Sequence, residues 1–178
     1  MEAITKYFQG KDVQEIVVDC VITDQEDAYV QTRAEKLCVP SFYLTRKELS
    51  DPNFLIPFLE KRGIYAIILA GYLRLIPQFL LDAYPRKIVN IHPALLPKYG
   101  GKGMYGMNVH QAVKEANEKE TGITIHIIDH EYDKGEILCQ EKVCIDPCDP
   151  PEDIAQKVHT LEHQYFASTI EKWINSKN

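Results

Sequence analysis

Two polar side chains stand where an apolar segment ends, in the stretch VNIHPALLPKYGG (residues 89–101). Asn90 and His92 are two positions apart, so an extended backbone would point both side chains to the same side. An amide donor beside an imidazole can stabilise a developing oxyanion, and the imidazole can also move a proton. The pair therefore suggests a catalytic centre. The competing interpretation is that both side chains satisfy backbone groups at a sheet edge.

A carboxylate that could complete such a centre is Asp133, in the stretch YDKG. Aspartate followed two positions later by glycine is typical of a hairpin turn, which is the simpler interpretation. The alternative is that the chain carries Asp133 over the sheet end to His92. A carboxylate in that place would favour the protonated imidazole.

A second set of titratable side chains occurs near the C-terminus, in HTLEH. His159 and His163 are four positions apart on a predicted helix, and Glu162 lies beside them. This spacing can bind a metal ion, but the stretch departs from the H-E-x-x-H pattern and offers no third ligand, so we predict no metal site. Glu162 is a candidate contact for an amine, and a solvated helix face is the competing interpretation.

Two further features carry weaker signals. His126, in ITIHIID, could face inward or outward on a strand, and such a histidine is more often structural than catalytic. Lys98–Gly106 contains four glycines among nine residues. This segment could close over a substrate, with Lys98 or Lys102 meeting an anion, or it could be a simple surface loop.

The elements that must position these residues alternate between helices and strands. Apolar periodicity predicts helices over residues 2–8, 28–37, 54–63, 77–85, 108–120 and 150–174. Apolar and β-branched runs predict strands over 15–23, 39–44, 65–71, 87–92, 122–129 and 136–146, with 65–71 buried on both faces. This order predicts an α/β fold: a mostly parallel sheet, helices on both faces and a C-terminal antiparallel hairpin. Ligands of such sheets bind beyond the carboxyl ends of the strands, where Asn90 and His92 would lie.

Composition limits the classes of function. The length of 178 residues suits a single domain. Lys and Arg number 20 against 26 Asp and Glu, and the net charge of −6 argues against a nucleic-acid partner. The five cysteines form no C-x-x-C pair, which favours reduced thiols. The sequence has no membrane-spanning run and no signal-peptide pattern, so we predict a cytoplasmic protein without membrane contact.

Three separated stretches, NIHPALLPKYGG, GITIHIIDHEYDKGEILCQEKV and HTLEHQYF, resemble the phosphoribosylglycinamide formyltransferase family, in the family's order. The resemblance runs from about Tyr65 to the C-terminus and more loosely back to Met1. It implies a Rossmann-like formyltransferase fold. It also implies transfer of a formyl group from 10-formyltetrahydrofolate to the amine of glycinamide ribonucleotide, in de novo purine synthesis. The implied partners are therefore these two small molecules. The resemblance implies no metal ion, and it leaves open whether the protein forms a homodimer.

The resemblance also implies roles for individual residues. Asn90 and protonated His92 would stabilise the oxyanion that forms when the amine attacks the formyl carbon. Asp133 would orient His92 and assist proton transfer through water. Glu162 would hold the amine, and Pro93 would be a second substrate contact. The implied folate pocket is lined by Arg74, Leu75, Ile76, Asn90, Ile128, Asp129, His130 and Asp133.

The sequence departs from the family's pattern in three features, one of which is a slightly longer GGKGMYG loop. The family begins with a strand and a phosphate-binding loop, whereas residues 1–178 correspond to a single formyltransferase domain without them. We therefore hypothesise that Met1 is an internal methionine or a late start and that the working protein is longer. Ala94 also stands where the family has serine. The alternatives are another formyltransferase that uses 10-formyltetrahydrofolate, a formyltetrahydrofolate hydrolase, or an inactive folate-binding remnant.

Overall fold

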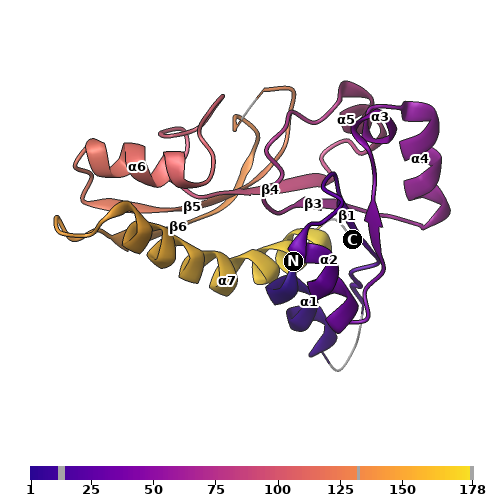
Figure 1. Ribbon diagram of the computed structural model, residues 1–178, viewed down its shortest axis with the longest axis horizontal. Coiled ribbons are helices and arrows are strands. Elements are labelled where there is room, and N and C mark those ends of the chain that lie inside the picture. Colours follow the sequence, from indigo (N-terminus) through magenta and orange to yellow (C-terminus); the bar gives the residue numbers. More distant parts are fainter. Residues whose placement is uncertain (12–14, 132, 177–178) are drawn as a thin grey trace. The chain divides into compact units, whose positions relative to one another are not determined.

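The computed structural model describes residues 1–11, 15–131 and 133–176, and helices alternate with strands along most of this length (Figure 1). The chain divides into two compact units. The first comprises Met1–Tyr65 and Pro77–Ala83, and the second comprises Ala66–Ile76 and Tyr84–Asn178.

The first unit contains a pair of short parallel strands and five helices. The predicted strand over 15–23 is realised only at its end, where β1 pairs with β2 through three register positions. A helix that was not predicted, α3, begins with a reciprocal capping box between Thr45 and Glu48. The helix after it begins at Pro52, with Asp51 as its cap. The elements are α1 (Glu2–Gln9), β1 (Val21–Thr23), α2 (Tyr29–Lys36), β2 (Ser41–Tyr43), α3 (Arg46–Leu49), α4 (Pro52–Lys61) and α5 (Gln78–Ala83).

The second unit contains a four-stranded sheet in the order β3-β4-β5-β6. β3 and β4 are parallel, whereas β5 is antiparallel to both β4 and β6. The α/β fold and the C-terminal hairpin are confirmed, and the sheet of this unit is mixed, because the first hairpin strand joins β4 in the antiparallel sense. The elements are β3 (Ile67–Leu69), β4 (Ile88–His92), α6 (Met107–Glu115), β5 (Glu120–Ile127), β6 (Ile137–Cys144) and α7 (Pro151–Asn175).

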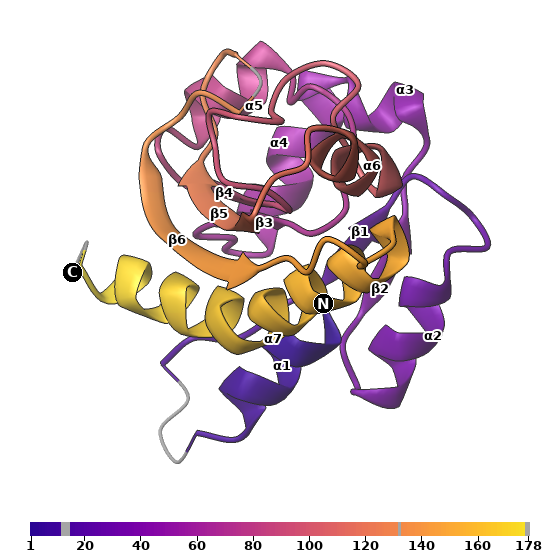
Figure 2. The ribbon, with the colours of Figure 1, turned by 90° about the vertical axis from the view of Figure 1, so that its left-hand side faces the viewer.

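The core of this unit centres on β5, and the strand predicted over 65–71 to be buried on both faces is only partly buried. Every residue of β5 from Thr121 to Ile127 is buried, whereas only Leu69 is buried in β3. The reason is position, since β5 has a neighbour on each side and β3 is an end strand of this sheet. The long helix α7 packs along β5 and β6, and α6 packs against α7 (Figures 1 and 2). This buried, doubly paired strand carries some of the polar side chains of the candidate site.

Candidate active site

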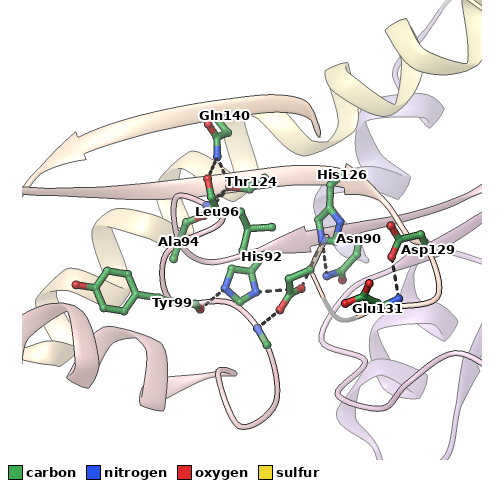
Figure 3. A network of polar contacts seen from close by, with 12 residues as sticks. Asn90, His92, Ala94, Leu96, Tyr99, Thr124, His126, Asp129, Glu131 and Gln140 are labelled. Carbon is green, nitrogen blue, oxygen red and sulfur yellow. Dashed lines mark hydrogen bonds and ion pairs between the residues drawn. The ribbon is translucent and has the colours of Figure 1, made fainter. Parts of the chain in front are cut away.

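The register between β4 and β5 brings three polar side chains to one face of the sheet. Asn90 lies directly opposite His126, and His92 lies opposite Thr124. Alternate residues of a strand share a face, so Asn90, His92 and His126 point to the same side (Figure 3). Asn90 Nδ2 is 3.3 Å from His126 Nε2. The cluster therefore lies over a face of the sheet at the end of β4, and not only beyond the strand ends.

Asp133 reaches this face from the segment between β5 and β6. Its φ of 55° is in the left-handed region, which aspartate tolerates better than most residues. Asp133 Oδ1 is 3.6 Å from His92 Nδ1 and 3.6 Å from His126 Nε2. Asp133 Oδ2 accepts a hydrogen bond from the backbone N–H of Gly101, at 2.8 Å. The structure thus brings together the three residues predicted to form the centre, Asn90, His92 and Asp133.

His126 is a fourth member of the cluster that the sequence did not single out as functional. Its side chain is completely buried. Burial lowers the pKa of His126, and the negative charge of Asp133 opposes that shift. The neutral ring is therefore favoured. The available signal was the alternation in ITIHI (residues 123–127), which places Thr124 and His126 on one face of the strand.

His92 is held by a backbone group on its other ring nitrogen. His92 Nε2 is 2.7 Å from the carbonyl oxygen of Tyr99, and the histidine is only 4% exposed. A carbonyl oxygen can only accept a hydrogen bond, so Nε2 must carry the hydrogen. Backbone partners such as Tyr99 O and Gly101 N leave no side-chain signature, which is why the sequence analysis missed them.

The segment after His92 is fixed by a buried hydroxyl. Thr124 Oγ1 donates to the carbonyl of Ala94 at 2.7 Å and accepts from the backbone N–H of Leu96 at 3.0 Å. The amide of Gln140 donates to Leu96 O at 2.8 Å and to Thr124 Oγ1 at 3.0 Å (Figure 3). Strands β5 and β6 therefore hold the turn that leads away from His92.

Glu162 lies on α7 within a second acid–histidine group. Its Oε2 is 2.9 Å from His159 Nδ1, and the rings of His159 and His163 are 4.1 Å apart. A buried histidine of α6, His110, interacts electrostatically both with Glu162 of this group and with His92 of the centre. Burial lowers the pKa of His110, Glu162 opposes the shift and His92 adds to it. His110 thus lies within electrostatic range of both, and the sequence analysis did not identify it.

Apart from Asn90 on β4, the residues predicted to line a folate pocket fall in two segments of this unit. Leu69 lies opposite Asn90 in the parallel pair β3–β4, so the segment that follows β3 leaves the sheet beside the centre. In that segment Arg74 and Leu75 are exposed and Ile76 is buried. In the other segment Ile128 and Asp129 are partly buried and His130 is exposed, while Tyr132 lies outside the described residues. Pro93, directly after His92, is partly buried.

Among the residues that the structure describes, no group of three or more His, Cys, Asp or Glu side chains is placed to hold a metal ion. No helix within the described ranges has the length and apolar character needed to cross a membrane. All five cysteines are free thiols.

Comparison with known proteins identifies the family. The family model described as "Formyl transferase" matches residues 2–170. The phosphoribosylglycinamide formyltransferase of Bacillus subtilis (strain 168) is 37% identical over 162 residues, which cover 89% of this chain and 80% of the relative. This chain belongs to the phosphoribosylglycinamide formyltransferase family. The resemblance of the three sequence stretches is therefore confirmed.

Other members of this family differ in how much of their length is matched. A chloroplastic phosphoribosylglycinamide formyltransferase of Arabidopsis thaliana is 43% identical over 141 residues, and the chain spans about half, 48%, of its length. Among solved structures, the phosphoribosylglycinamide formyltransferase of Bacillus halodurans superposes with a TM-score of 0.86 at 32% identity, and the match covers 99% of this chain and 90% of that one. The Rossmann-like fold expected for the family is thus supported by a close structural neighbour.

Proposed function

We propose that this chain transfers the formyl group of 10-formyltetrahydrofolate to the amino group of glycinamide ribonucleotide. The observation that carries the proposal is the meeting of Asn90, His92 and Asp133 on one face of the sheet, with the carboxylate 3.6 Å from the imidazole. Membership of the family supports the choice of substrates. Residues 1–178 would act as one formyltransferase domain.

The reaction needs a group that stabilises negative charge on the formyl oxygen. The substrate amine attacks the formyl carbon, the carbonyl π electrons move to oxygen, and a tetrahedral intermediate forms. Asn90 Nδ2 is one proposed donor to that oxygen. The other is Nδ1–H of the protonated His92 ring, because Nε2 donates to the carbonyl of Tyr99. Loss of one such donor typically lowers the rate by ~10²–10³. Asn90 and His92 therefore carry the largest electrostatic contribution in this proposal.

Proton transfer completes the reaction. The bond between the formyl carbon and the folate nitrogen breaks, that nitrogen takes up a proton, and the attacking nitrogen releases one. Asp133, in contact with His92, assists this exchange through water and keeps the imidazole oriented, a role worth roughly 10²–10⁴ in rate. His126 contacts both Asn90 and Asp133, and its burial favours the form without a positive charge.

Substrate contacts are proposed on either side of the centre. The Glu162 carboxylate, which is 26% exposed and on α7, would hold the amine, and Pro93 would lie against the ribonucleotide. The folate would lie against Arg74, Leu75, Ile76 and the described residues of the 128–133 segment. No step of this scheme requires a metal ion or nucleic acid. The five free thiols favour a reducing compartment such as the cytoplasm.

One assay tests the function against its alternatives. Purified protein is given 10-formyltetrahydrofolate with glycinamide ribonucleotide, with methionyl-tRNA, or with no acceptor, and formylated product and free formate are both measured. We expect formyl transfer only to glycinamide ribonucleotide, and a loss of ~10²–10³ in kcat for Asn90→Ala. Formate release without an acceptor would instead identify a hydrolase. Folate binding without turnover would identify an inactive remnant.

A further inference from the structure

A short backbone segment contacts both titratable residues of the proposed centre. In the segment Tyr99–Gly101, named the strap here, the first carbonyl accepts from His92 Nε2 at 2.7 Å and the last N–H donates to Asp133 Oδ2 at 2.8 Å. The strap passes close to Asp133, because a Cβ added at Gly100 would lie 3.1 Å from Asp133 Cβ. One three-residue segment thus holds His92 and Asp133 at once.

The strap is held in turn by Glu118, which bonds to the side chain of Tyr99. The Tyr99 hydroxyl donates to Glu118 Oε1 at 2.8 Å, and Lys98 Nζ lies 2.8 Å from the same oxygen. Glu118 lies in the turn between α6 and β5, and its side chain is 25% exposed. The Lys98 and Tyr99 hydrogen bonds lower the pKa of Glu118, and burial together with Glu118 raises the pKa of Tyr99. An ionised acceptor therefore faces a neutral phenol donor at neutral pH.

We propose that Glu118, acting through Tyr99, is a positioning residue that fixes the hydrogen of His92 on Nε2. A neutral imidazole has two tautomers, and the one present is set by the partner of each ring nitrogen. With Tyr99 O as a fixed acceptor for Nε2, the Nδ1 edge is left to face Asp133. The proposal extends the proposed function, because this ring is the one expected to act in formyl transfer.

The backbone of Tyr99 shows why an external anchor is needed. Tyr99 has a φ of 57°, in the left-handed region that is uncommon for a residue with a bulky side chain. Such a conformation persists only where its surroundings determine it. The hydrogen bond of the Tyr99 hydroxyl to Glu118 is the described contact that ties this side chain to another element. Removing that bond should let the carbonyl leave His92.

The test compares variants that break the anchor with variants that keep it. Tyr99→Phe removes the donor and Glu118→Ala removes the acceptor. Glu118→Gln keeps an oxygen that can accept, and Lys98→Gln removes only the exposed partner of Glu118. Long-range ¹H–¹⁵N correlation spectra of the histidine rings, recorded without substrate, report which nitrogen of His92 carries the hydrogen. The His92 signals are assigned by their loss in His92→Asn.

The expected result separates the two pairs of variants. Wild type, Glu118→Gln and Lys98→Gln should show a protonated Nε2, whereas Tyr99→Phe and Glu118→Ala should show a mixture of tautomers. In the formyl-transfer assay the latter two should lose about tenfold in kcat with KM within about twofold, because a misplaced general acid–base group loses part of its contribution. Circular dichroism confirms folding. Glu118→Ala is the variant that decides, because Glu118 lies in a turn and its side chain is only partly buried.

Unchanged His92 ring signals in a folded Glu118→Ala protein would overturn the proposal. Equal changes in Glu118→Gln and Glu118→Ala would also overturn it, since the retained acceptor would then be irrelevant. The spectra require no turnover. If the wild-type protein transfers no formyl group, the proposed function fails while the ring spectra still decide whether Glu118 positions His92.

Discussion

The second unit contains two groups in which a carboxylate meets a pair of histidines. On the sheet face, Asp133 Oδ1 lies 3.6 Å from both His92 and His126. On α7, Glu162 lies 2.9 Å from His159, whose ring contacts that of His163. The residue types are the same, yet the first group is assembled from β4, β5 and the segment after β5, whereas the second comes from a single helix.

The difference between these groups is burial. His92 and His126 are 4% and 0% exposed, whereas the side chain of His159 is 62% exposed. Water screens a charge at an exposed site and solvates any group that loses its partner, so contacts there contribute little. A buried group has no such substitute, and its partners must all come from the protein. We therefore expect that disturbing the side-chain contacts on the sheet face lowers kcat or stability far more than disturbing those on α7.

The largest effect is expected for Asp133→Asn, which tests whether the buried carboxylate on the sheet face is needed for formyl transfer. Asparagine tolerates the left-handed backbone at this position and keeps an oxygen that Gly101 can donate to, so the fold should survive. Because the charge beside His92 is lost, kcat for formyl transfer should fall by ~10²–10⁴. Steady-state kinetics measures the loss, with Glu136→Gln, at an exposed position between Asp133 and β6, as the control. A kcat near that of wild type would remove Asp133 from the mechanism.

The next variant tests packing at the strap. An alanine methyl at Gly100 would lie 2.6 Å from Leu96 Cδ2 and 3.1 Å from Asp133 Cβ. Overpacking of this kind typically costs about 1–3 kcal/mol, so Gly100→Ala should lower the free energy of unfolding by that amount. Thr160→Ala, at an exposed position of α7, should stay within about 0.5 kcal/mol. Urea unfolding measures both, and adding Leu96→Val, which lacks the clashing Cδ2, should recover part of the loss.

The sequence predicted those parts of the fold and site that depend on local pattern. The alternation of Asn90 and His92, the hairpin and the long helix carrying Glu162 are all local features, and the structure has each of them. It did not predict that β5 runs antiparallel to β4, because strand direction is set by tertiary packing. Without that register, His126 had no visible link to Asn90. The carbonyl of Tyr99 was also hidden, because every residue has one.

Two buried histidines, His110 and His126, should make the free energy of unfolding depend on pH. Burial lowers the pKa of His110 and His126 in the folded protein, while unfolding restores the ordinary value of about 6.5. The unfolded chain therefore binds these protons at higher pH than the folded one. The free energy of unfolding should be intact above about pH 6.5 and fall as the pH decreases below it.

His110→Gln tests this contribution, because glutamine does not titrate. Urea unfolding at about pH 7.5, 6.5 and 5.5 should show a shallower decrease for His110→Gln than for wild type. His159→Gln is the matched control at an exposed histidine and is measured at the same pH values. Parallel profiles for wild type and His110→Gln would show that burial of His110 does not contribute to acid sensitivity.

The smallest effect is expected at the exposed group itself. His159→Gln keeps a donor near Glu162 and removes the ring that contacts His163. Since His159 is 62% exposed, water replaces much of what is lost, and kcat should stay within about twofold of wild type. Glu162→Gln serves as the matched variant, because loss of the proposed amine contact should raise KM for glycinamide ribonucleotide. A large drop in kcat for His159→Gln would mean that the α7 group acts as part of the centre, and the contrast between the two groups would then fail.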